Sequence, residues 1–413
     1  MDLKKTGHTL NFLFMAADRF PPFRNDVVVL FAHEILSRGH KIDWLLQSEE
    51  AIDKASQVSW YDSTVRVGAA SSGESKFARI RRNLQGFRND LRAFKLAKEN
   101  SYDFIQVKDK FIAGMIGLLA AKRSRTKFVY WLSYPFPEAQ IYRARTGTAV
   151  FPLLYLLRGY AFKFILYRII LRFSDHIFVQ SEQMKRDVMN EGIPEGKLTA
   201  ISMGVSPEIL DNELCHSPEA SPGNSEKIVL YLGTLLKVRR MDFVIRLFVK
   251  VLDEVPDAIL YMVGGSTEPE DLETLKKLAV DLGVEDKVVF TGNLPQEDAL
   301  KYVQRAHVCL SPFLPTPIFN STSPTKLVEY MAMGKAVVAN DHPEQRLVLT
   351  ESGAGICVPY EETAFADAIV RLLKDLDATV EMGIKGREYV KQYRNYKYLA
   401  DLVENEYLDM CNC

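Results

Sequence analysis

Short apolar runs alternate with longer amphipathic stretches from one end of the chain to the other. Residues 10–15 form an apolar run, residues 27–38 are apolar-rich and stop at Gly39, and residues 41–46 are apolar again. The first and last runs are predicted to be strands, the middle stretch a helix, and the proline-containing residues 16–25 a loop. Strand, helix and strand in this order are typical of a crossover unit in a parallel sheet, so the pattern favours an α/β fold.

The same alternation continues over the rest of the chain. Ser181 is predicted to cap a further helix, and residues 365–373 and 386–407 are predicted to be helices. The remaining predicted strands are residues 104–107, 128–132, 175–179, 228–234, 259–263, 288–294, 308–312 and 336–339.

A chain of 413 residues is too long for one ordinary hydrophobic core and suits two domains of roughly 200 residues. Residues 206–226 are rich in Pro, Ser, Glu and Asn, and are predicted to be the hinge. The first domain is then residues 1–205, and the second begins at residue 227. The predicted fold class is α/β, with two doubly wound, Rossmann-like domains.

Two stretches of the first domain combine basic with apolar residues. Residues 76–98 hold eight Lys and Arg and one acid, Asp90, and predict a basic amphipathic helix or helix pair. Residues 149–173 are the most hydrophobic part of the chain, but basic residues interrupt them too often for a membrane-spanning helix. A helix lying in the membrane interface fits them, and a buried interdomain helix is the alternative. For the first stretch the alternative is a solvated face on a packing helix.

Charge is divided unevenly between the two halves of the chain, although the net charge is −1. Residues 1–205 carry 31 Lys and Arg against 20 Asp and Glu, a balance of +11, and the remainder carries 21 against 33, or −12. The first half therefore suits an anionic partner. Because no nucleic-acid-binding motif accompanies the charge, we expect an anionic membrane surface rather than nucleic acid.

The compartment is indicated by the cysteines and the N-terminal segment. The five cysteines are odd in number and scattered without zinc spacing, which indicates a reducing compartment. The apolar run that ends near residue 17 is short, and is interpreted as a first strand rather than a signal peptide. We therefore expect a cytoplasmic protein that binds the inner face of the membrane peripherally.

The densest candidate chemistry lies in residues 319–341. Ser323 is predicted to cap a helix whose first residue is Pro324, and Gly334 to end that helix before the short buried strand at residues 336–339. Free N–H groups and the helix dipole both favour negative charge at such a terminus. The pattern therefore predicts an anion site.

Three polar side chains share one face of this predicted helix. Thr325 and Lys326 lie in its first turn, and Glu329 follows Thr325 by four residues, about one turn beyond the anion site. That separation suits a sugar diol attached to a phosphate. The stretch predicts a nucleotide-diphosphate cradle with the ribose on Glu329, and a capped core helix with an exposed glutamate is the alternative.

A second candidate anion site follows the predicted strand at residues 228–234. The strand runs into Gly233, where backbone can approach a ligand closely, and Lys237, Arg239 and Arg240 come soon after it. A diphosphate leaving group needs cationic stabilisation, which these side chains can supply. Solvated surface cations are the alternative.

The stretch FNSTSPTKLVEYMAMGKAVVAND resembles the signature of the family-4 retaining glycosyltransferases, which build their nucleotide-sugar site on such a helix. The resemblance implies the GT-B fold, in which two Rossmann-like domains face each other across a cleft and the second binds the nucleotide. The later glutamate of the family's pair, eight positions after the first, binds the ribose and corresponds to Glu329. Ser321 stands where the earlier glutamate is expected, which alters the sugar end of the implied donor site.

Other segments extend the resemblance over essentially the whole chain. HEILSRGHKIDWLL is similar to the family's first helix and second strand, and SDHIFVQSEQMKRDVMNEGIPEGKLTAISMGVSPE to the last crossover of its first domain. The implied donor-binding domain is residues 227–385, and residues 386–413 are implied to cross back onto the first domain. A turn at Gly264, and the segment Gly292, Asn293 and Leu294, which is similar to the family's base-binding loop, complete the implied donor site.

Two departures concern charged residues of the family. Family members use an Arg and a Lys, five positions apart after the strand-end glycine, to neutralise the diphosphate, and Thr234 and Arg239 stand at these positions. Lys237 or Arg240 would supply the missing charge.

The acceptor side also differs from the family. Family members commonly place a histidine at the end of the strand predicted at residues 128–132, close to the transferred sugar. Ser133 or Tyr134 stands there now, and Glu138 is a partial substitute, with an ordinary loop as the alternative.

The resemblance implies transfer of a sugar, with retention, from a nucleotide-diphosphate sugar such as a UDP-sugar to a hydroxyl of a glycan or lipid-linked acceptor. Arg239, Lys326 and Glu329 are predicted to carry the reaction. The leaving phosphate can accept the acceptor's proton, so no protein nucleophile, metal or other cofactor is expected. Two alternatives stay open, a nucleotide-sugar 2-epimerase and a non-catalytic subunit that binds a nucleotide-sugar or a partner transferase. The base stays open between uridine and guanosine.

Overall fold

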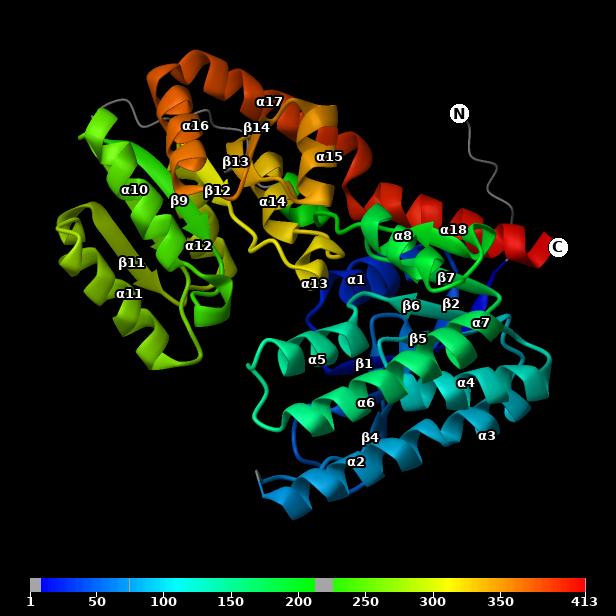
Figure 1. Cartoon of the computed structure of the whole chain (residues 1–413). Coiled ribbons are helices and arrows are strands. Elements are labelled where there is room, and N and C mark those ends of the chain that lie inside the picture. Colours follow the sequence, from blue (N-terminus) through cyan, green and yellow to red (C-terminus); the bar gives the residue numbers. More distant parts are fainter. Residues whose placement is uncertain (1–8, 74, 212–225, 413) are drawn as a thin grey trace. The chain divides into compact units, whose positions relative to one another are not determined.

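The computed structural model describes residues 9–73, 75–211 and 226–412. The chain divides into two compact units, one formed by Met1–Ser202 with Leu399–Cys413 and the other by Met203–Tyr398. Each unit has its own sheet with helices packed on it (Figure 1). The predicted hinge at 206–226 falls mostly outside the described residues, which include only its two ends.

The first unit is built on an eight-stranded sheet of order β3-β4-β2-β1-β5-β6-β7-β8. Neighbouring strands are parallel except β3 and β4, which form an antiparallel hairpin at one edge. The central β5 is buried along its whole length, as expected for a strand covered on both faces. The strands are β1 Asn11–Phe20, β2 Lys41–Ser48, β3 Ser56–Trp60, β4 Ser63–Gly68, β5 Phe104–Lys108, β6 Lys127–Leu132, β7 His176–Val179 and β8 Leu198–Ala200.

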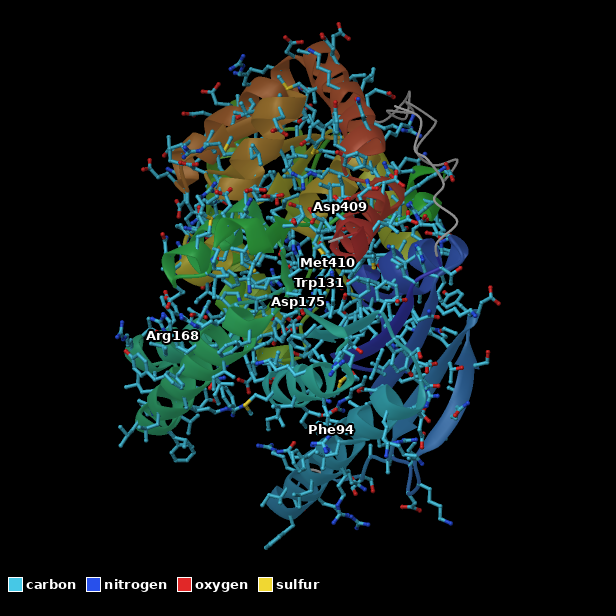
Figure 2. All side chains as sticks on the ribbon, turned by 90° about the vertical axis from the view of Figure 1, so that its right-hand side faces the viewer. Phe94, Trp131, Arg168, Asp175, Asp409 and Met410 are labelled. Carbon is cyan, nitrogen blue, oxygen red and sulfur yellow. The ribbon has the colours of Figure 1, made fainter. Side chains whose placement is uncertain are left out.

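Helices cover this sheet, and Trp131 of β6 lies fully inside the unit (Figure 2). The C-terminal helix also packs on this sheet. The centroid of its Tyr407 ring lies 4.8 Å from the ring centroids of both Phe12 on β1 and Phe104 on β5. The helices are α1 Asn25–Val28, a π-helical segment Leu30–Ile35, α2 Lys76–Asp90, α3 Arg92–Glu99, α4 Phe111–Ser124, α5 Phe136–Arg145, α6 Pro152–Phe164, a π-helical segment Ile165–Ile170, α7 Leu171–Phe173, α8 Glu182–Asn190, a 3-10 turn Glu195–Lys197 and α18 Tyr396–Asn412.

Several predictions for the first unit are confirmed and three are corrected. Residues 76–98 form the predicted helix pair, and Ser181 caps α8 by accepting a hydrogen bond from the Met184 N–H at 3.0 Å. Residues 16–20 are strand rather than loop, because β1 continues to pair with β2 beyond a register shift. The hairpin β3–β4 was not predicted, and Glu138 lies in α5 rather than in a loop.

The second unit is built on a six-stranded, fully parallel sheet of order β11-β10-β9-β12-β13-β14. Numbered within the unit, this order is 3-2-1-4-5-6, the doubly wound arrangement of dinucleotide-binding domains. The predicted strands at 228–234, 259–263, 288–294, 308–312 and 336–339 are all confirmed, within a residue or two at their ends. They are β9 Lys227–Leu232, β10 Ala258–Val263, β11 Val288–Gly292, β12 Val308–Ser311, β13 Ala336–Asn340 and, in addition, β14 Gly355–Val358.

Hydrophobic clusters lie on both faces of this sheet, one around α10 and α16 and the other around α12, α14 and α17. The helices are α9 Pro207–Leu210, a 3-10 turn Lys237–Arg239, α10 Asp242–Glu254, α11 Pro269–Asp281, a 3-10 turn Glu285–Lys287, α12 Gln296–Arg305, α13 Pro317–Asn320, α14 Thr325–Ala332, α15 Pro343–Ser352, α16 Glu362–Lys374 and α17 Leu376–Tyr393.

The single helix predicted over residues 386–407 is wrong. Helix α17 ends at Tyr393, and α18 begins at Tyr396 after two residues outside either helix. Arg394 leaves the helical conformation and pairs with the buried carboxylate of Glu344 at 3.0 Å. Asn395 then accepts a hydrogen bond from the Tyr398 N–H at 2.8 Å, as a helix cap does, so a new helix starts there.

Candidate functional site

The strand order of the second unit marks where a ligand can approach its sheet. The order reverses between β9 and β12, and in doubly wound sheets ligands bind at the carboxyl ends of the strands beside such a reversal. Gly233 follows β9 directly, and the segment after β12 leads into α14. The predicted donor-site residues are therefore gathered around one edge of one sheet.

Three glycines from consecutive strand ends meet at this edge. The Gly233 N–H donates to the Val263 carbonyl at 2.9 Å, and Gly264 and Gly292 pair through an isolated bridge. A Cβ atom added to Gly264 would lie 2.2 Å from the Gly233 carbonyl oxygen, so no other residue fits there without moving the backbone. The backbone segments after β9 and β10 therefore pack directly against each other at this position.

Lys326 brings the first turn of α14 to the same place. Its Nζ donates to the Tyr231 hydroxyl at 2.9 Å and lies 4.1 Å from the centroid of that ring. A Cβ on Gly233 would come within 3.2 Å of this Nζ. Burial, and next the charge of Arg239, lower the pKa of Lys326 well below its usual value, which Glu329 only partly opposes. The ammonium is thus poorly compensated until an anion joins it.

Glu329 lies one turn further along α14, as its spacing predicted. Burial raises the pKa of its carboxyl group, and Lys326 opposes that shift. The next residue anchors the helix to the sheet, because the Tyr330 hydroxyl accepts from the Leu232 N–H at 2.7 Å. This contact holds α14 against the end of β9, which fixes the spacing between Gly233 and the residues of the first turn.

The predicted start of this helix is wrong by one position. Helix α14 begins at Thr325, and Pro324, in an extended conformation, is its cap residue without a capping side chain. The Ser323 hydroxyl instead accepts a hydrogen bond from the Met203 N–H at 3.0 Å. Ser323 therefore ties the segment before α14 to the start of this unit, and the N–H groups of the first turn are not capped by it.

Ser321 is held in the loop before α14. Its side chain is buried and its hydroxyl donates to the Pro317 carbonyl at 3.3 Å. Helix α13, which precedes Ser321, is also held by His342. Its Nδ1 accepts from the Glu344 N–H at 3.2 Å, so Nε2 carries the proton that it donates to the Phe319 carbonyl at 2.7 Å. Burial lowers the pKa of His342, which keeps the ring neutral in this role. The sequence did not predict this histidine as part of the site.

The three cations after Gly233 have different surroundings. Arg240 pairs with Asp242 through two contacts of 3.0 Å, and Lys237 is exposed. Arg239 is half-buried, and its charge adds to the effect of burial in lowering the pKa of Lys326. Burial raises the pKa of Tyr231 to about 12, and Arg239 opposes that rise. Among these three cations, Arg239 is therefore the one whose charge acts on Lys326.

The remaining predicted donor residues lie around the glycines. Thr234 is exposed, and its carbonyl is 3.4 Å from the Tyr231 hydroxyl. Asn293 is exposed, and a Cβ on Gly265 would come within 2.7 Å of its side-chain oxygen. Leu294 is half-buried against the core around α12 and α14. Asn293 and Leu294 of the predicted base loop thus directly follow Gly292 of the glycine cluster.

The acceptor-side residues of the first unit do not form one group. The buried Ser133 receives a hydrogen bond from the Arg24 guanidinium at 3.0 Å, donates its own hydroxyl to Asp109, and its N–H donates to Asp109 at 2.8 Å. The Tyr134 ring packs against Phe136 with centroids 4.9 Å apart. Glu138 faces Lys163 of α6 at 3.7 Å, and burial raises the pKa of its carboxyl group.

A buried charge network around Ser133 was not predicted. Lys108 is fully buried and lies 3.1 Å from Asp18, 3.4 Å from Asp26 and 3.5 Å from Asp109. The network occupies the carboxyl ends of β1 and β5, where the strand order of this unit reverses. Asp109 has a φ of +54°, an uncommon conformation for a residue other than glycine. A Lys-Asp-Lys run directly after a strand was the only signal in the sequence.

Within residues 9–73, 75–211 and 226–412, no three His, Cys, Asp or Glu side chains are arranged to hold a metal ion. No helix in that part of the chain is both long and apolar enough to cross a bilayer.

Two family models match the chain. Residues 25–209 match the model described as Glycosyltransferase Family 4, and residues 226–375 match the one described as Glycosyl transferases group 1. Together they take in both units and the segment from Gly233 to Glu329.

Curated relatives match over part of their length. N-acetyl-alpha-D-glucosaminyl L-malate synthase of Bacillus anthracis is 29% identical over 188 residues, which are 45% of this chain and 46% of the relative. Alpha-monoglucosyldiacylglycerol synthase of Streptococcus pneumoniae is 24% identical over 299 residues, 70% of this chain and 62% of the relative. The chain thus spans about half the length of the first curated relatives.

A solved structure matches both units. The Anabaena Alr3699/HepE protein in complex with UDP superposes with a TM-score of 0.68, covering 96% of this chain and 99% of that one at 14% identity. At this identity the likeness concerns the fold alone.

Proposed function

The chain belongs to glycosyltransferase family 4 and has the GT-B fold, and from that premise we propose that it moves a sugar, with retention, from a nucleotide-diphosphate donor to an acceptor hydroxyl. The observation that carries the proposal is the poorly compensated Lys326 beside the glycines at the end of β9. A diphosphate is the kind of group that this arrangement suits.

The proposed donor contacts follow from the geometry of that edge. Lys326, Arg239 and the N–H groups of the first turn of α14, at Thr325 and Lys326, hold the diphosphate and stabilise its departure. Glu329 accepts the ribose hydroxyls one turn further on. Gly233, Gly264 and Gly292 let the backbone approach the nucleotide, and Asn293 and Leu294 border the base. Because Ser321 stands at the sugar end, the donor class is more firmly supported than the sugar.

No protein nucleophile is required by this proposal. The donor's anomeric carbon loses its bond to the diphosphate oxygen and forms one to the acceptor oxygen on the same face. The leaving phosphate oxygen takes the acceptor's proton. Lys326 and Arg239 neutralise the charge that develops on that phosphate, which is the task a divalent metal serves elsewhere. Transfer that continues undiminished in a chelator would support metal independence, and loss of transfer would overturn it.

We propose that the first unit binds the acceptor and a membrane surface. Helix α6 leaves large apolar side chains exposed next to Arg158, among them Leu153 at 71% and Leu157 at 63%. Such a surface suits the membrane interface, where apolar groups enter the acyl region and basic groups meet phosphate. The Streptococcus relative is named as a synthase that acts in diacylglycerol glycolipid formation, which supports a lipid-linked acceptor here.

The experiment is incubation of the purified chain with single nucleotide-diphosphate sugars, with and without lipid acceptors. UDP-sugars come first, because the Anabaena structure carries UDP. NMR of the products distinguishes three results. An α-linked glycoside from an α-linked donor supports retaining transfer, and an epimerised donor without acceptor supports the 2-epimerase. Donor binding without turnover under every acceptor would favour the non-catalytic subunit.

A further inference from the structure

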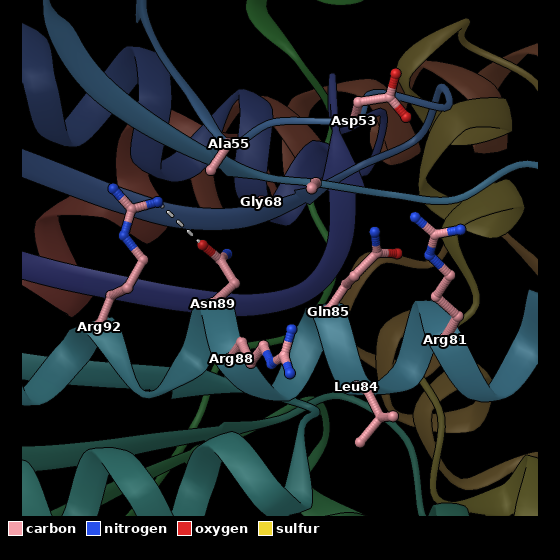
Figure 3. A pocket seen from close by; sticks show the side chains of 10 residues that line it. Asp53, Ala55, Gly68, Arg81, Leu84, Gln85, Arg88, Asn89 and Arg92 are labelled. Atoms are coloured by element: carbon pink, nitrogen blue, oxygen red, sulfur yellow. Dashed lines mark hydrogen bonds between the residues drawn. The ribbon is translucent and has the colours of Figure 1, made fainter.

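A pocket of about 410 Å³ lies in the first unit beside the carboxyl end of β4. One wall is formed where hairpin β3–β4 begins and ends, at Ala55 and Gly68, and the other by α2 and the first residue of α3 (Figure 3). A Cβ on Gly68 would come within 2.6 Å of the Asn89 side chain. The strand and the helix thus approach each other as closely as a glycine permits.

Most of the charged side chains that line the pocket are basic. Arg81, Arg88 and Arg92 line it, and Asp53 is the one carboxylate among its lining residues. The arginines are separated by seven and four positions, which puts them on one side of a helix. In Figure 3 the guanidinium groups of Arg81 and Arg92 are directed toward the strand that carries Gly68. The pocket therefore suits an anion that several guanidinium groups can share.

One of these arginines is fixed from the sheet. Arg92 donates from Nη1 to the Asn89 Oδ1 at 3.3 Å, and Asn89, which is buried, donates from Nδ2 to the Leu46 carbonyl of β2 at 3.0 Å. The amide oxygen of Gln85 accepts from both the N–H and the hydroxyl of Ser71, at 3.0 and 2.9 Å. Its remaining polar atom is a nitrogen that can only donate. Arg92 and Gln85 are thus hydrogen-bond donors in the pocket whose positions are fixed by the protein before a ligand binds.

An exposed apolar stripe runs along the same helix. Its side chains are separated by four, three and four positions and are well exposed, at Ile80 56%, Leu84 54%, Phe87 42% and Leu91 39%. Leu84 belongs both to the stripe and to the lining of the pocket. A helix with apolar side chains exposed beside a line of arginines is built for the level of lipid phosphates, where the stripe enters the acyl region.

We propose that this pocket binds the phosphate group of an anionic phospholipid while the apolar stripe contacts its acyl chains. Arginine is suited to this role because its planar group donates two parallel hydrogen bonds to phosphate oxygens. The proposal deepens the membrane attachment proposed above, and it stands or falls independently of sugar transfer. Net charge alone predicts only nonspecific attraction between this surface and an anionic membrane, whereas the proposal assigns a defined lipid site to it.

The test compares two variants that lose the same charge from the same pair of helices. Arg81→Gln/Arg88→Gln/Arg92→Gln empties the pocket of cations, and Arg79→Gln/Lys95→Gln/Lys98→Gln removes three cations that do not line it. Flotation of the full chain is measured on phosphatidylcholine vesicles containing about 20 mol% phosphatidylglycerol. The pocket variant is expected to bind on the order of tenfold or more weakly, and the control within about threefold of the parent. Unchanged melting temperatures verify that both variants fold.

Two further arms identify the ligand. Vesicles of the same surface charge are prepared with a fatty-acid anion in place of phosphatidylglycerol. These vesicles should bind the parent chain less well than phosphatidylglycerol vesicles do. They should also bind the parent chain no better than they bind the pocket variant. Equal losses in the two variants, or equal binding to the two vesicle types, would overturn the proposal in favour of diffuse attraction. Calorimetric saturation of the pocket by inorganic phosphate at micromolar concentration would overturn it in favour of a soluble phosphorylated ligand. Whether the parent chain transfers sugar is a separate readout, so failure of either proposal can be recognised by itself.

Discussion

At the strand-order reversal of the second unit, Lys326 lies against Tyr231 and the backbone of Gly233, whereas at the reversal of the first unit Lys108 lies among Asp18, Asp26 and Asp109. Both lysines lie at the carboxyl edge of a parallel sheet, where Lys108 is fully buried and Lys326 is half-buried. Burial lowers the pKa of Lys326 well below its usual value, while the carboxylates around Lys108 raise the pKa of that lysine in spite of burial.

The difference separates the proposed ligand site around Lys326 from a charge network around Lys108 whose members compensate one another. A buried cation with little compensation is costly, and an arriving anion removes that cost. A buried cation among carboxylates is already compensated, and its loss leaves negative charges unpaired. Mutation of the two lysines should therefore affect different properties, binding in the second unit and stability in the first.

The largest effect is expected from Lys108→Met. The substitution leaves Asp18, Asp26 and Asp109 with Arg24 as their remaining close cation, and breaking a buried ion pair in this way costs about 3–5 kcal/mol of unfolding free energy. The loss is measured as the change in unfolding free energy in the urea-induced transition of the first unit.

Two variants sharpen this expectation. Lys95→Met removes an exposed lysine that pairs with Glu99 at 3.7 Å and should cost less than about 0.5 kcal/mol. Lys108→Met/Asp109→Asn should recover part of the loss, because one unpaired carboxylate is neutralised. A Lys108→Met chain as stable as Lys95→Met would contradict the network.

Lys326→Met should have the next largest effect, on nucleotide binding rather than on stability. Removing a charge-assisted contact to the diphosphate is expected to weaken UDP binding by about 2–3 kcal/mol, or roughly 30-fold to 150-fold. Calorimetry with UDP measures the change.

The matched control is Lys301→Met, an exposed lysine paired with Asp298 at 2.8 Å elsewhere in the same unit. Its affinity for UDP should equal that of the parent chain. If Lys326→Met bound UDP as well as this control does, the diphosphate would have to lie elsewhere.

A smaller effect is expected from Glu329→Gln, because the amide keeps one acceptor for the ribose but loses its charge. Binding of UDP should weaken by about 1–1.5 kcal/mol, or roughly fivefold to twelvefold, and the chain should distinguish UDP from its 2′-deoxy analogue less well than the parent does. Competition calorimetry with the two nucleotides measures both quantities. Glu297→Gln, an exposed glutamate of α12, is the control. Unaltered discrimination in Glu329→Gln would remove the ribose from this residue.

The places of the candidate residues in the second unit were largely predictable, because the signals for their strands and helices are local. Gly233 stands at the end of an apolar run, and Lys326 and Glu329 stand at helical spacing within one short stretch. Periodicity and strand ends gave their places without knowledge of distant contacts. Gly334, with φ +66°, ends α14 as predicted, for the same reason.

The failures depend on partners far away in sequence. Ser323 looked like a helix cap, but its hydroxyl accepts from Met203, which is 120 residues away. Helix α17 ends because Arg394 pairs with Glu344 on α15. The network around Lys108 draws its carboxylates from three separate elements, and no spacing rule connects them. Tertiary contacts of this kind override local preference, and a single sequence does not contain them.

The smallest predicted effect is the uptake of a fraction of a proton when UDP binds, and it tests the role of Lys326 most directly. An anion bound beside Lys326 raises the pKa of this lysine from its depressed value in the free chain, so binding of UDP takes up protons between the two pKa values. Affinity should therefore be greatest below the pKa of the free chain and fall as pH rises through it, by at most about tenfold per pH unit. Calorimetry in two buffers of different ionisation enthalpy measures the uptake, which Lys326→Met should abolish and Lys301→Met should retain. Proton uptake that persisted in Lys326→Met would mean that another group, and not this lysine, is completed by the nucleotide.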